Sequence, residues 1–308
     1  MSEYYTPSEE EVASYFDSLS NWGRWGAEDE LGTLNYITPA KRVAAAAAVQ
    51  HGESVGCARQ IVREPVKSDV PFPPMHFMMR SGESPGSTGA SDFLGLSPHG
   101  FTISHVDALC HKFYQGMMYN GFPQNLVRTE GGASVCSIET MKDGVVTRGV
   151  LFDIPRHRGV DTLAAGDGVF PEELEEIEQE LGFEVSEGDA VLLRTGWPKH
   201  RAAEGPDPRA GRFRPGFHAA VLPWLHERKV SVIAADASQD VAPSGYELML
   251  PVHEIAITRM GMILLDACEF EDLAVACDRY SRWTFMYVMA PVRFKGATGS
   301  PITPVAIF

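Results

Sequence analysis

The sequence predicts an α/β fold. Segments with helical patterning alternate with short apolar runs typical of buried strands, and this alternation favours a sheet covered by helices. The chain has 308 residues, of which 44% are hydrophobic and 22% charged, which is ordinary for a globular protein and sufficient for one large domain or two small ones. No internal repeat and no long linker divides it.

Three segments are predicted to be helical. The first begins after Thr38, whose side chain suits an N-cap, and closes at Gly52. The second covers residues 171–182 and is so acidic that we expect it to face solvent. The third covers residues 215–229, where Pro223 should kink or interrupt the helix.

Five apolar runs are predicted to be strands, and they alternate with or follow these helices. They occupy residues 149–154, 190–195, 230–236, 262–267 and 283–294, the last being the longest. A segment rich in Gly, Ser and Pro, residues 81–98, is predicted to be a loop that leads into a cluster of histidines.

The composition excludes several classes of protein. A formal net charge of −15 disfavours nucleic-acid binding, which needs clustered Lys and Arg. No apolar run is long enough for a membrane span, and the N-terminus lacks the features of a signal peptide. The five cysteines form no CxxC pair and are odd in number, so we expect neither a disulfide framework nor a zinc ribbon and place the protein in the cytoplasm. They are Cys57, Cys110, Cys136, Cys268 and Cys277.

The most informative stretch is SHVDALCH, residues 104–111. If residues 103–107 are extended, His105 and Asp107 share one face and their Cα atoms lie about 6.6 Å apart, so an imidazole and a carboxylate can converge on one cation. His111 follows four residues later. His99 can join only if the chain bends at Gly100. The same spacing is also common in simple hydrogen-bonded pairs, so spacing alone leaves both interpretations open.

A cysteine in this stretch raises the alternative of a nucleophilic site. Cys110 precedes His111, but neighbours in a strand point to opposite sides, whereas a Cys–His pair needs hydrogen-bond contact. We therefore expect Cys110 to be a small buried residue.

A second polar cluster lies near the C-terminus. His253 falls on a predicted helix, and Asp266 ends a predicted strand, where a carboxylate is often functional in α/β folds. Both have structural alternatives, because a histidine near a helix start can pack or cap, and Asp266 can cap the next helix.

The chain resembles the metal-dependent cyclase family, which includes bacterial kynurenine formamidase and isatin hydrolase. The family's hallmark has the form HxGTHxDxPxH and stands here as HGFTISHVDALCH, residues 99–111. The resemblance is nearly full-length, because NWGRWGAEDELGTLNYITP, MMYNGFP, LLRTGW and DASQDVAPS resemble a divergent, longer-chain branch of the family. It implies a single domain over residues 1–308 with a swivelling β/α/β fold.

The resemblance also implies roles for individual residues. His105 and Asp107 match metal ligands, and His253 matches a later metal-binding histidine. His111 matches the histidine that does acid/base work, and Asp107 would help to hold the attacking water.

Two positions depart from the family pattern. The family's first histidine falls on Phe101 here, and the nearest candidate for a ligand is His99. The family's last acidic ligand falls on Leu265, so Asp266 is the candidate and Glu269 its rival.

The function implied is a metal-dependent hydrolase of a small cyclic or aryl amide, lactam or related ester. The cation would be zinc or manganese, because a set of nitrogen and oxygen ligands without thiolate fits either. Two alternatives remain, a metal-dependent lyase that dehydrates its substrate or closes a ring, and a binding protein that needs metal but does no chemistry.

The partner implied is a small molecule, bound by a homodimer or homotetramer. Aromatic side chains are candidate walls for the substrate, although core packing explains each of them as readily. Two further residues, in PMHFMMR, are candidate contacts for a substrate carboxylate. The walls are Trp22, Trp25, Phe77, Tyr119 and Phe122, and the polar contacts are His76 and Arg80.

Overall fold

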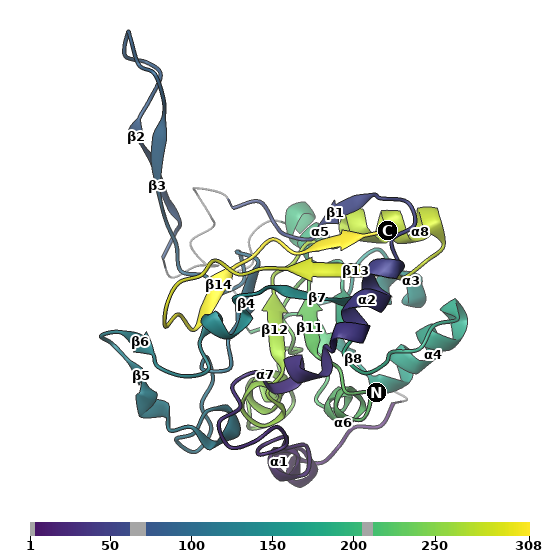
Figure 1. Ribbon diagram of the computed structural model, residues 1–308. Coiled ribbons are helices and arrows are strands. Elements are labelled where there is room, and N and C mark those ends of the chain that lie inside the picture. The colour runs from purple at the N-terminus through teal and green to yellow at the C-terminus, as the bar shows by residue number, and fades with distance from the viewer. Residues whose placement is uncertain (1–3, 62–71, 205–211) are drawn as a thin grey trace.

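One mixed sheet of nine strands forms the centre of the structure, a computed structural model that describes residues 4–61, 72–204 and 212–308. Its strand order is β1-β15-β13-β7-β9-β11-β12-β4-β14 (Figure 1). Neighbouring strands β7, β9, β11 and β12 run parallel, and the strands on either side of them run antiparallel. The α/β class predicted from the sequence is confirmed.

The strands of this sheet are short except for β7. They are β1 (Ser54–Gly56), β4 (His105–Asp107), β7 (Val145–Asp153), β9 (Ala190–Arg194), β11 (Val232–Ala235), β12 (Ile263–Asp266), β13 (Thr284–Met289), β14 (Gly299–Pro301) and β15 (Val305–Ile307). Every residue of β9, β11 and β12 is buried, as expected for parallel strands that are covered on both faces.

Helices cover the sheet. They are α1 (Glu9–Ser18), α2 (Pro39–Ala47), α3 (Ile154–Arg158), α4 (Pro171–Leu181), α5 (Trp197–Glu204), α6 (Val221–Glu227), α7 (Pro251–Ile255) and α8 (Glu271–Tyr280). α2 packs on β7 and β13, α8 packs near β1, and α1 packs on α7. α1, α6 and α7 gather in the lower part of the view in Figure 1.

All five predicted strands exist, with shifted ends. β7 begins four residues before the predicted start at residue 149, and β13 ends at Met289 rather than at residue 294. The condition set for the histidine-rich stretch, an extended segment 103–107, is met at His105–Asp107, which form β4. His253 lies on α7, as expected.

The first predicted helix forms but is shorter than expected. The Thr38 hydroxyl accepts a hydrogen bond from the backbone N–H of Lys41 (3.1 Å) and caps α2. The helix ends at Ala47, so the prediction that Gly52 closes it is wrong.

The acidic helix α4 ends as predicted, with Gly182 in the left-handed conformation at φ 70°. The expectation that it faces solvent is wrong in part, because Glu173 and Glu178 are buried. Arg158 donates to the Glu173 carboxylate (2.7 Å), and Arg228 donates to that of Glu178 (3.2 Å). These contacts compensate the burial of the two charges.

The third predicted helix begins later than expected. Residues Gly216–Phe217 form strand β10, which pairs with β8 (Gly168–Val169), and α6 begins only at Val221. Pro223 therefore falls in the first turn of α6, where the missing N–H has no helical partner to lose. Pro223 thus lies near the start of a shorter helix and does not interrupt a longer one.

The segment 81–98 is not wholly a loop. β3 (Ser91–Gly95) pairs with β2 (Met75–Arg80) to form a hairpin that projects from the body (Figure 1). A smaller pair joins β5 (Val127–Arg128) to β6 (Gly132–Ala133). No helix among the described residues is long and apolar enough to cross a bilayer.

Candidate metal centre

Strand β4 carries the central residues of the HxD motif. His105 and Asp107 lie two residues apart and project from the same face of the strand. Both side chains are only 2% exposed. Strands β12 and β14 pair with β4 on its two sides, so the motif is held within the sheet.

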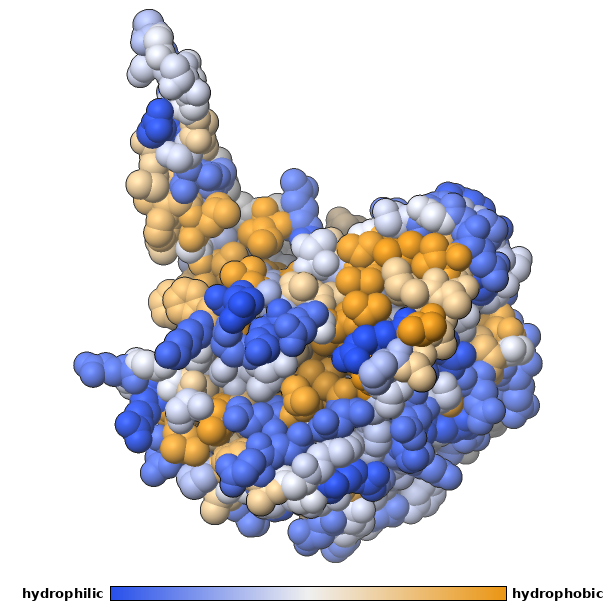
Figure 2. All heavy atoms as spheres, in the orientation of Figure 1, coloured by the Kyte–Doolittle hydropathy of each residue, from blue (hydrophilic) through white to orange (hydrophobic). Residues whose placement is uncertain are grey.

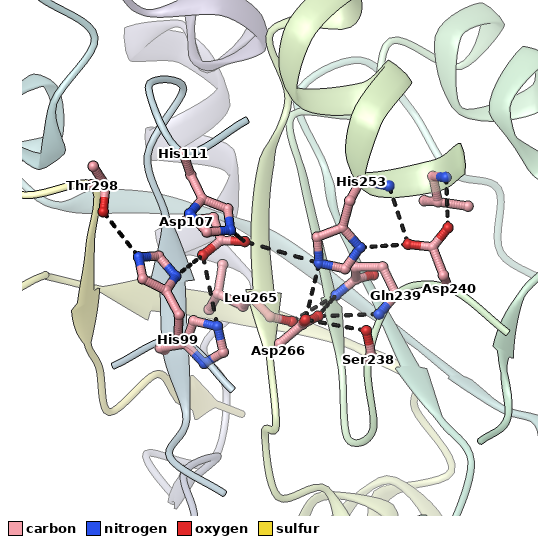
Figure 3. Close-up of polar contacts among 12 residues, drawn as sticks. His99, Asp107, His111, Ser238, Gln239, Asp240, His253, Leu265, Asp266 and Thr298 are labelled. Atoms are coloured by element: carbon pink, nitrogen blue, oxygen red, sulfur yellow. Dashed lines mark hydrogen bonds and ion pairs between the residues drawn. The ribbon is translucent and has the colours of Figure 1, made fainter. Parts of the chain in front are cut away.

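Four imidazoles surround the Asp107 carboxylate. Its Oδ1 atom lies 2.9 Å from Nδ1 of His99 and 3.6 Å from Nε2 of His105. Its Oδ2 atom lies 3.8 Å from Nε2 of His111 and 3.9 Å from Nε2 of His253. Figure 3 shows this arrangement, in which segments far apart in the sequence meet at one carboxylate.

The bend that His99 requires is present. Gly100 has a φ of 141°, in a region that favours glycine, and the chain turns there before β4. The His99 ring stacks on that of His111 with centroids 3.9 Å apart, and its Nε2 atom pairs with the Thr298 hydroxyl (3.0 Å). The structure thus brings His99 to Asp107, where the sequence alone left its position open.

The arrangement fits a divalent cation. Nδ1 of His99 and Oδ1 of Asp107 are buried and have no hydrogen bond, although they lie 2.9 Å apart. Ligand atoms of His99, Asp107 and His111 all lie within 4.8 Å of one another. Ligands about 2.0–2.2 Å from a shared ion are separated by about 3–4 Å, so only small movements would bring these atoms to one ion.

The register of β4 with β12 explains why Asp266, rather than Leu265, faces the site. Asp266 is paired with His105, and residues opposite each other in antiparallel strands project from the same face. Leu265 is paired with Val106 and projects from the other face, into the core. The Asp266 carboxylate lies 3.0 Å from Nε2 of His253.

The family model described as "Putative cyclase" matches residues 38–239, which is more than half of the chain. The chain belongs to this cyclase family. The resemblance seen in the sequence is thereby confirmed.

Solved structures share the fold of this cyclase. A crystal structure described as that of a novel cyclase is 31% identical, with a TM-score of 0.85, and the match covers 94% of this chain and 100% of that one. Isatin hydrolase A from Labrenzia aggregata, bound to benzyl benzoate, is 20% identical with a TM-score of 0.60, covering 88% and 100%. Isatin hydrolase A from Ralstonia solanacearum is 19% identical with a TM-score of 0.61, covering 87% and 97%. No protein with a curated description matches the chain.

The segment after β11 supports the second half of the cyclase's site. The Gln239 backbone N–H (3.1 Å) and the Ser238 hydroxyl (3.2 Å) donate to the Asp266 carboxylate. Asp240 accepts hydrogen bonds from the N–H groups of Val252 (2.7 Å) and His253 (3.1 Å), and also contacts Nδ1 of the His253 ring. These contacts fix the orientation of the His253 ring, as partners of metal-binding histidines commonly do.

Sequence reasoning gave Ser238, Gln239 and Asp240 no role. A signal was available, because β11 and β12 are parallel neighbours and residues that follow their carboxyl ends meet at one edge. Asp240 follows β11, and Asp266 is the last residue of β12.

Arg59 is a second residue that the sequence did not indicate. Its guanidinium donates to the backbone carbonyls of Phe101 (2.8 Å), Cys268 (3.2 Å) and Asp236. Its backbone N–H donates to Ser104 (2.8 Å). Each of these residues lies within a few positions of a site residue, so Arg59 joins the segments that carry the HxD motif, Asp240 and Asp266.

Charges in the site shift the pKa values of its groups in opposite directions. Burial opposes ionisation of Asp107, but the charges of His111, His105 and His99 outweigh it and hold the pKa of Asp107 well below its usual range. Burial lowers the pKa of His111 to about 3, although the charge of Asp107 acts to raise it, so this ring is neutral at pH 7. Burial also works to lower the pKa of His253, but Asp266 and Asp240 raise it to about 10.

The structure gives the predicted substrate walls partners of their own. Tyr119 is fully buried and donates to the Asp29 carboxylate (2.9 Å), so its ring is part of the core. The Trp22 indole donates to the backbone carbonyl of Thr258 (2.7 Å). Among the remaining candidates, Trp25 packs on Tyr36, Phe122 packs against the core, and His76, Phe77 and Arg80 belong to β2.

Cys110 is fully buried, and burial raises the pKa of its thiol to about 12. A thiol with that pKa is protonated at neutral pH and is a poor nucleophile. The structure therefore agrees with the expectation that Cys110 is a small buried residue.

Replacement of Asp266 should distinguish a ligand from a structural carboxylate. The structure argues against a helix cap, because α8 has Phe270 at its N-cap, whereas the Asp266 carboxylate faces His253. We expect Asp266→Ala to weaken metal binding about as much as His253→Ala does, because each change removes one ligand. Titration of the two metal-free variants with metal, followed by calorimetry, measures their metal affinities.

Glu269→Ala is the matched control. The Glu269 carboxylate accepts from the backbone N–H of Glu271 (3.2 Å) at the start of α8, so its loss should cost about 0.5–2 kcal/mol of stability and leave metal affinity unchanged. Full metal affinity in Asp266→Ala, together with its loss in Glu269→Ala, would transfer the ligand role to Glu269.

Proposed function

We propose that this cyclase-family protein is a metal-dependent hydrolase that opens a small cyclic or aryl amide, a lactam, or a related ester. The observation that carries the proposal is the group of four imidazoles around the buried Asp107 carboxylate, with Asp266 beside it. Such a set of nitrogen and oxygen donors suits zinc or manganese. The fold shared with isatin hydrolases supports the reaction class.

His105, His253, His99, Asp107 and Asp266 would hold the cation. Each oxygen of Asp107 faces two imidazoles, a donor set that would suit one ion or two. When bound, the cation supplies Lewis acidity, which polarises a carbonyl and makes a bound water more acidic.

His111 is placed to move the proton. It is the more solvent-accessible of the rings that face Oδ2 of Asp107, with a side chain 22% exposed against 5% for His253. A neutral imidazole there takes a proton from the attacking water and returns it to the leaving nitrogen or oxygen. Asp107 accepts a hydrogen bond from the same water and orients it, and the product is a carboxylate.

The test is product analysis in ¹⁸O-labelled water with a panel of amides, lactams and lactones. Hydrolysis places one solvent oxygen in the product carboxylate. A product that contains no solvent oxygen would show a lyase or ring-closing reaction instead. Bound metal with no turnover across the panel would favour a binding protein.

Metal retention should depend on pH. Imidazoles bind metal only when neutral. An unperturbed histidine titrates near about pH 6.5, whereas Asp266 and Asp240 raise the pKa of His253 to about 10, so protons compete with the metal at neutral pH and more strongly as the pH falls. We expect occupancy at limiting metal to fall as the pH drops from about 7 to about 5, and excess metal to shift the loss to lower pH. Equilibrium dialysis across this range measures it, and occupancy that stays constant down to pH 5 would contradict a histidine-rich site.

A further inference from the structure

Strand β14 lies at one edge of the sheet and pairs with β4, the strand that carries the HxD motif (Figure 1). The backbone N–H of Ala108 donates to the carbonyl of Thr298 (2.9 Å), which fixes the start of β14 against the end of β4. Gly299 is paired with Asp107, so a side chain at position 299 would project from the same face as the Asp107 carboxylate. Thr298 and Gly299 therefore border the metal centre.

The absence of a side chain at Gly299 leaves the room that the His99 ring occupies. A Cβ atom on Gly299 would lie 2.6 Å from Cε1 and 3.0 Å from Nε2 of His99, and 2.8 Å from the carbonyl oxygen of Val106. Such contacts are too close for a Cβ atom, so even alanine would displace the ring. The backbone of Gly299 is outside the left-handed region, so space rather than conformation accounts for the glycine at this position.

Thr298 holds the other side of the same ring. Nε2 of His99 pairs with the Thr298 hydroxyl (3.0 Å), while Nδ1 lies 2.9 Å from Oδ1 of Asp107 without a hydrogen bond between them. A neutral imidazole carries its proton on only one of the two nitrogens. If Nε2 donates that proton to the Thr298 oxygen, Nδ1 keeps a lone pair beside Asp107, where an ion can be bound.

The His99 ring needs such contacts because it lies near water. Its side chain is 26% exposed, against 3% for that of His105. Figure 2 shows hydrophilic residues over the part of the molecule where β14 lies in Figure 1. A ring that water reaches has other rotamers open to it, and these would take Nδ1 away from Asp107.

We propose that Thr298 and Gly299 are positioning residues that make His99 a metal ligand in this chain. The family's first histidine falls on Phe101, so His99 reaches Asp107 by a longer path, through the bend at Gly100. Gly299 leaves the room for the displaced ring, and the Thr298 hydroxyl sets its orientation and its tautomer. The inference rests on the metal centre of the proposed function and does not depend on which reaction that centre catalyses.

The first test measures the zinc affinity of the full-length, metal-stripped protein by competition with a chromophoric chelator. We expect Thr298→Val to weaken binding about 10–100-fold, the usual cost of losing a residue that orients a ligand. Thr298→Ser keeps the hydroxyl and should restore the affinity. Gly299→Ala should weaken binding by a comparable factor because it displaces the ring. Wild-type affinity in both Thr298→Val and Gly299→Ala would overturn the proposal.

Two substitutions of the same kinds are the matched controls. Gly56 lies in β1, at the opposite edge of the sheet, and a Cβ atom there would meet nothing within 4 Å. Thr33 is 1% exposed, and its hydroxyl donates to the carbonyl of Ser231 (2.7 Å), before the start of β11 and thus at the end of that strand away from Asp240. Gly56→Ala and Thr33→Val should both keep the zinc affinity of the wild type.

A double-variant cycle shows whether the two residues act through His99. In a His99→Ala protein, Thr298→Val should have no further effect on zinc affinity, and Gly299→Ala should cost less than it does in the wild type, because the ring that they position is gone. A further loss as large as in the wild type would show that they act on the fold instead, and would overturn the proposal.

The tautomer of His99 is a second measurement that needs no variant of β14. In ¹⁵N NMR spectra of the metal-free wild type at about pH 8.5, where an unperturbed histidine is neutral, His99 should carry its proton on Nε2. Its signals are those that disappear in His99→Ala. A proton on Nδ1 would contradict the role assigned to Thr298.

His105→Ala separates a failure of this inference from a failure of the proposed function. A wild type that binds zinc, loses it in His105→Ala and keeps it in Thr298→Val and Gly299→Ala would overturn the positioning role alone. A wild type without saturable zinc binding would contradict the metal centre itself, and the positioning role with it.

Discussion

His105→Ala is expected to abolish both metal binding and turnover. The ring is 2% exposed, its Nδ1 atom pairs with the backbone carbonyl of Ile103 (2.8 Å), and this contact aims Nε2 at Asp107. Loss of a residue that only orients a ligand typically costs about 10–100-fold in metal affinity, so the loss of His105 itself should cost more than about 100-fold. Metal titration and the initial rate on a turned-over substrate measure the two effects.

His157→Ala is the matched control. His157 is a surface histidine that pairs with Glu176 (3.2 Å) and Glu180 (3.5 Å) on α4, away from the metal centre. The His157→Ala protein should retain its full metal content and its full rate of turnover. A His105→Ala protein that keeps its metal would contradict the assignment of His105 as a ligand.

His111→Ala is expected to separate metal binding from chemistry. We expect this variant to keep its metal and to lose about 10²–10⁴-fold in kcat, the usual contribution of a general acid/base. The position of His111 also allows this residue to be a metal ligand, because ligand atoms of His111, His99 and Asp107 lie within 4.8 Å of one another. Added imidazole should restore part of the lost rate if the ring transfers protons.

Metal titration of His111→Ala decides between the two roles. If the affinity falls as far as in His105→Ala, His111 is a ligand and another group must move the proton. If both the affinity and the rate are unchanged, His111 has neither role.

Local patterns in the sequence were sufficient to predict the strand that carries the HxD motif and the helix that carries His253. Alternation alone places His105 and Asp107 on one face, and β4 confirms the extended backbone. The position of Asp266 could not follow from spacing, because it depends on which residue of β12 lies opposite His105 in a strand pair that is remote in sequence. The same limit applies to Asp240, whose contact with His253 depends on where the segment after β11 crosses the start of α7.

The aromatic residues show a second limit of what the sequence can predict. A pattern of tryptophan and tyrosine cannot tell a substrate wall from the core. Tyr119 is fully buried, and its hydroxyl donates to the Asp29 carboxylate. The segment 81–98 was predicted to be a loop because Gly, Ser and Pro dominate residues 81–90, while the pairing of β2 with β3 depends on the apolar residues that flank this turn.

The central claim is that this member of the cyclase family holds a divalent cation between its HxD strand and His253. The most direct test is elemental analysis of the protein purified without chelator, followed by titration of the stripped protein with zinc and with manganese. The account predicts one or two equivalents of zinc or manganese per chain, removed by chelator, restored by titration and lost in His105→Ala. A wild-type protein that carries no metal and shows no saturable binding of either ion would contradict it.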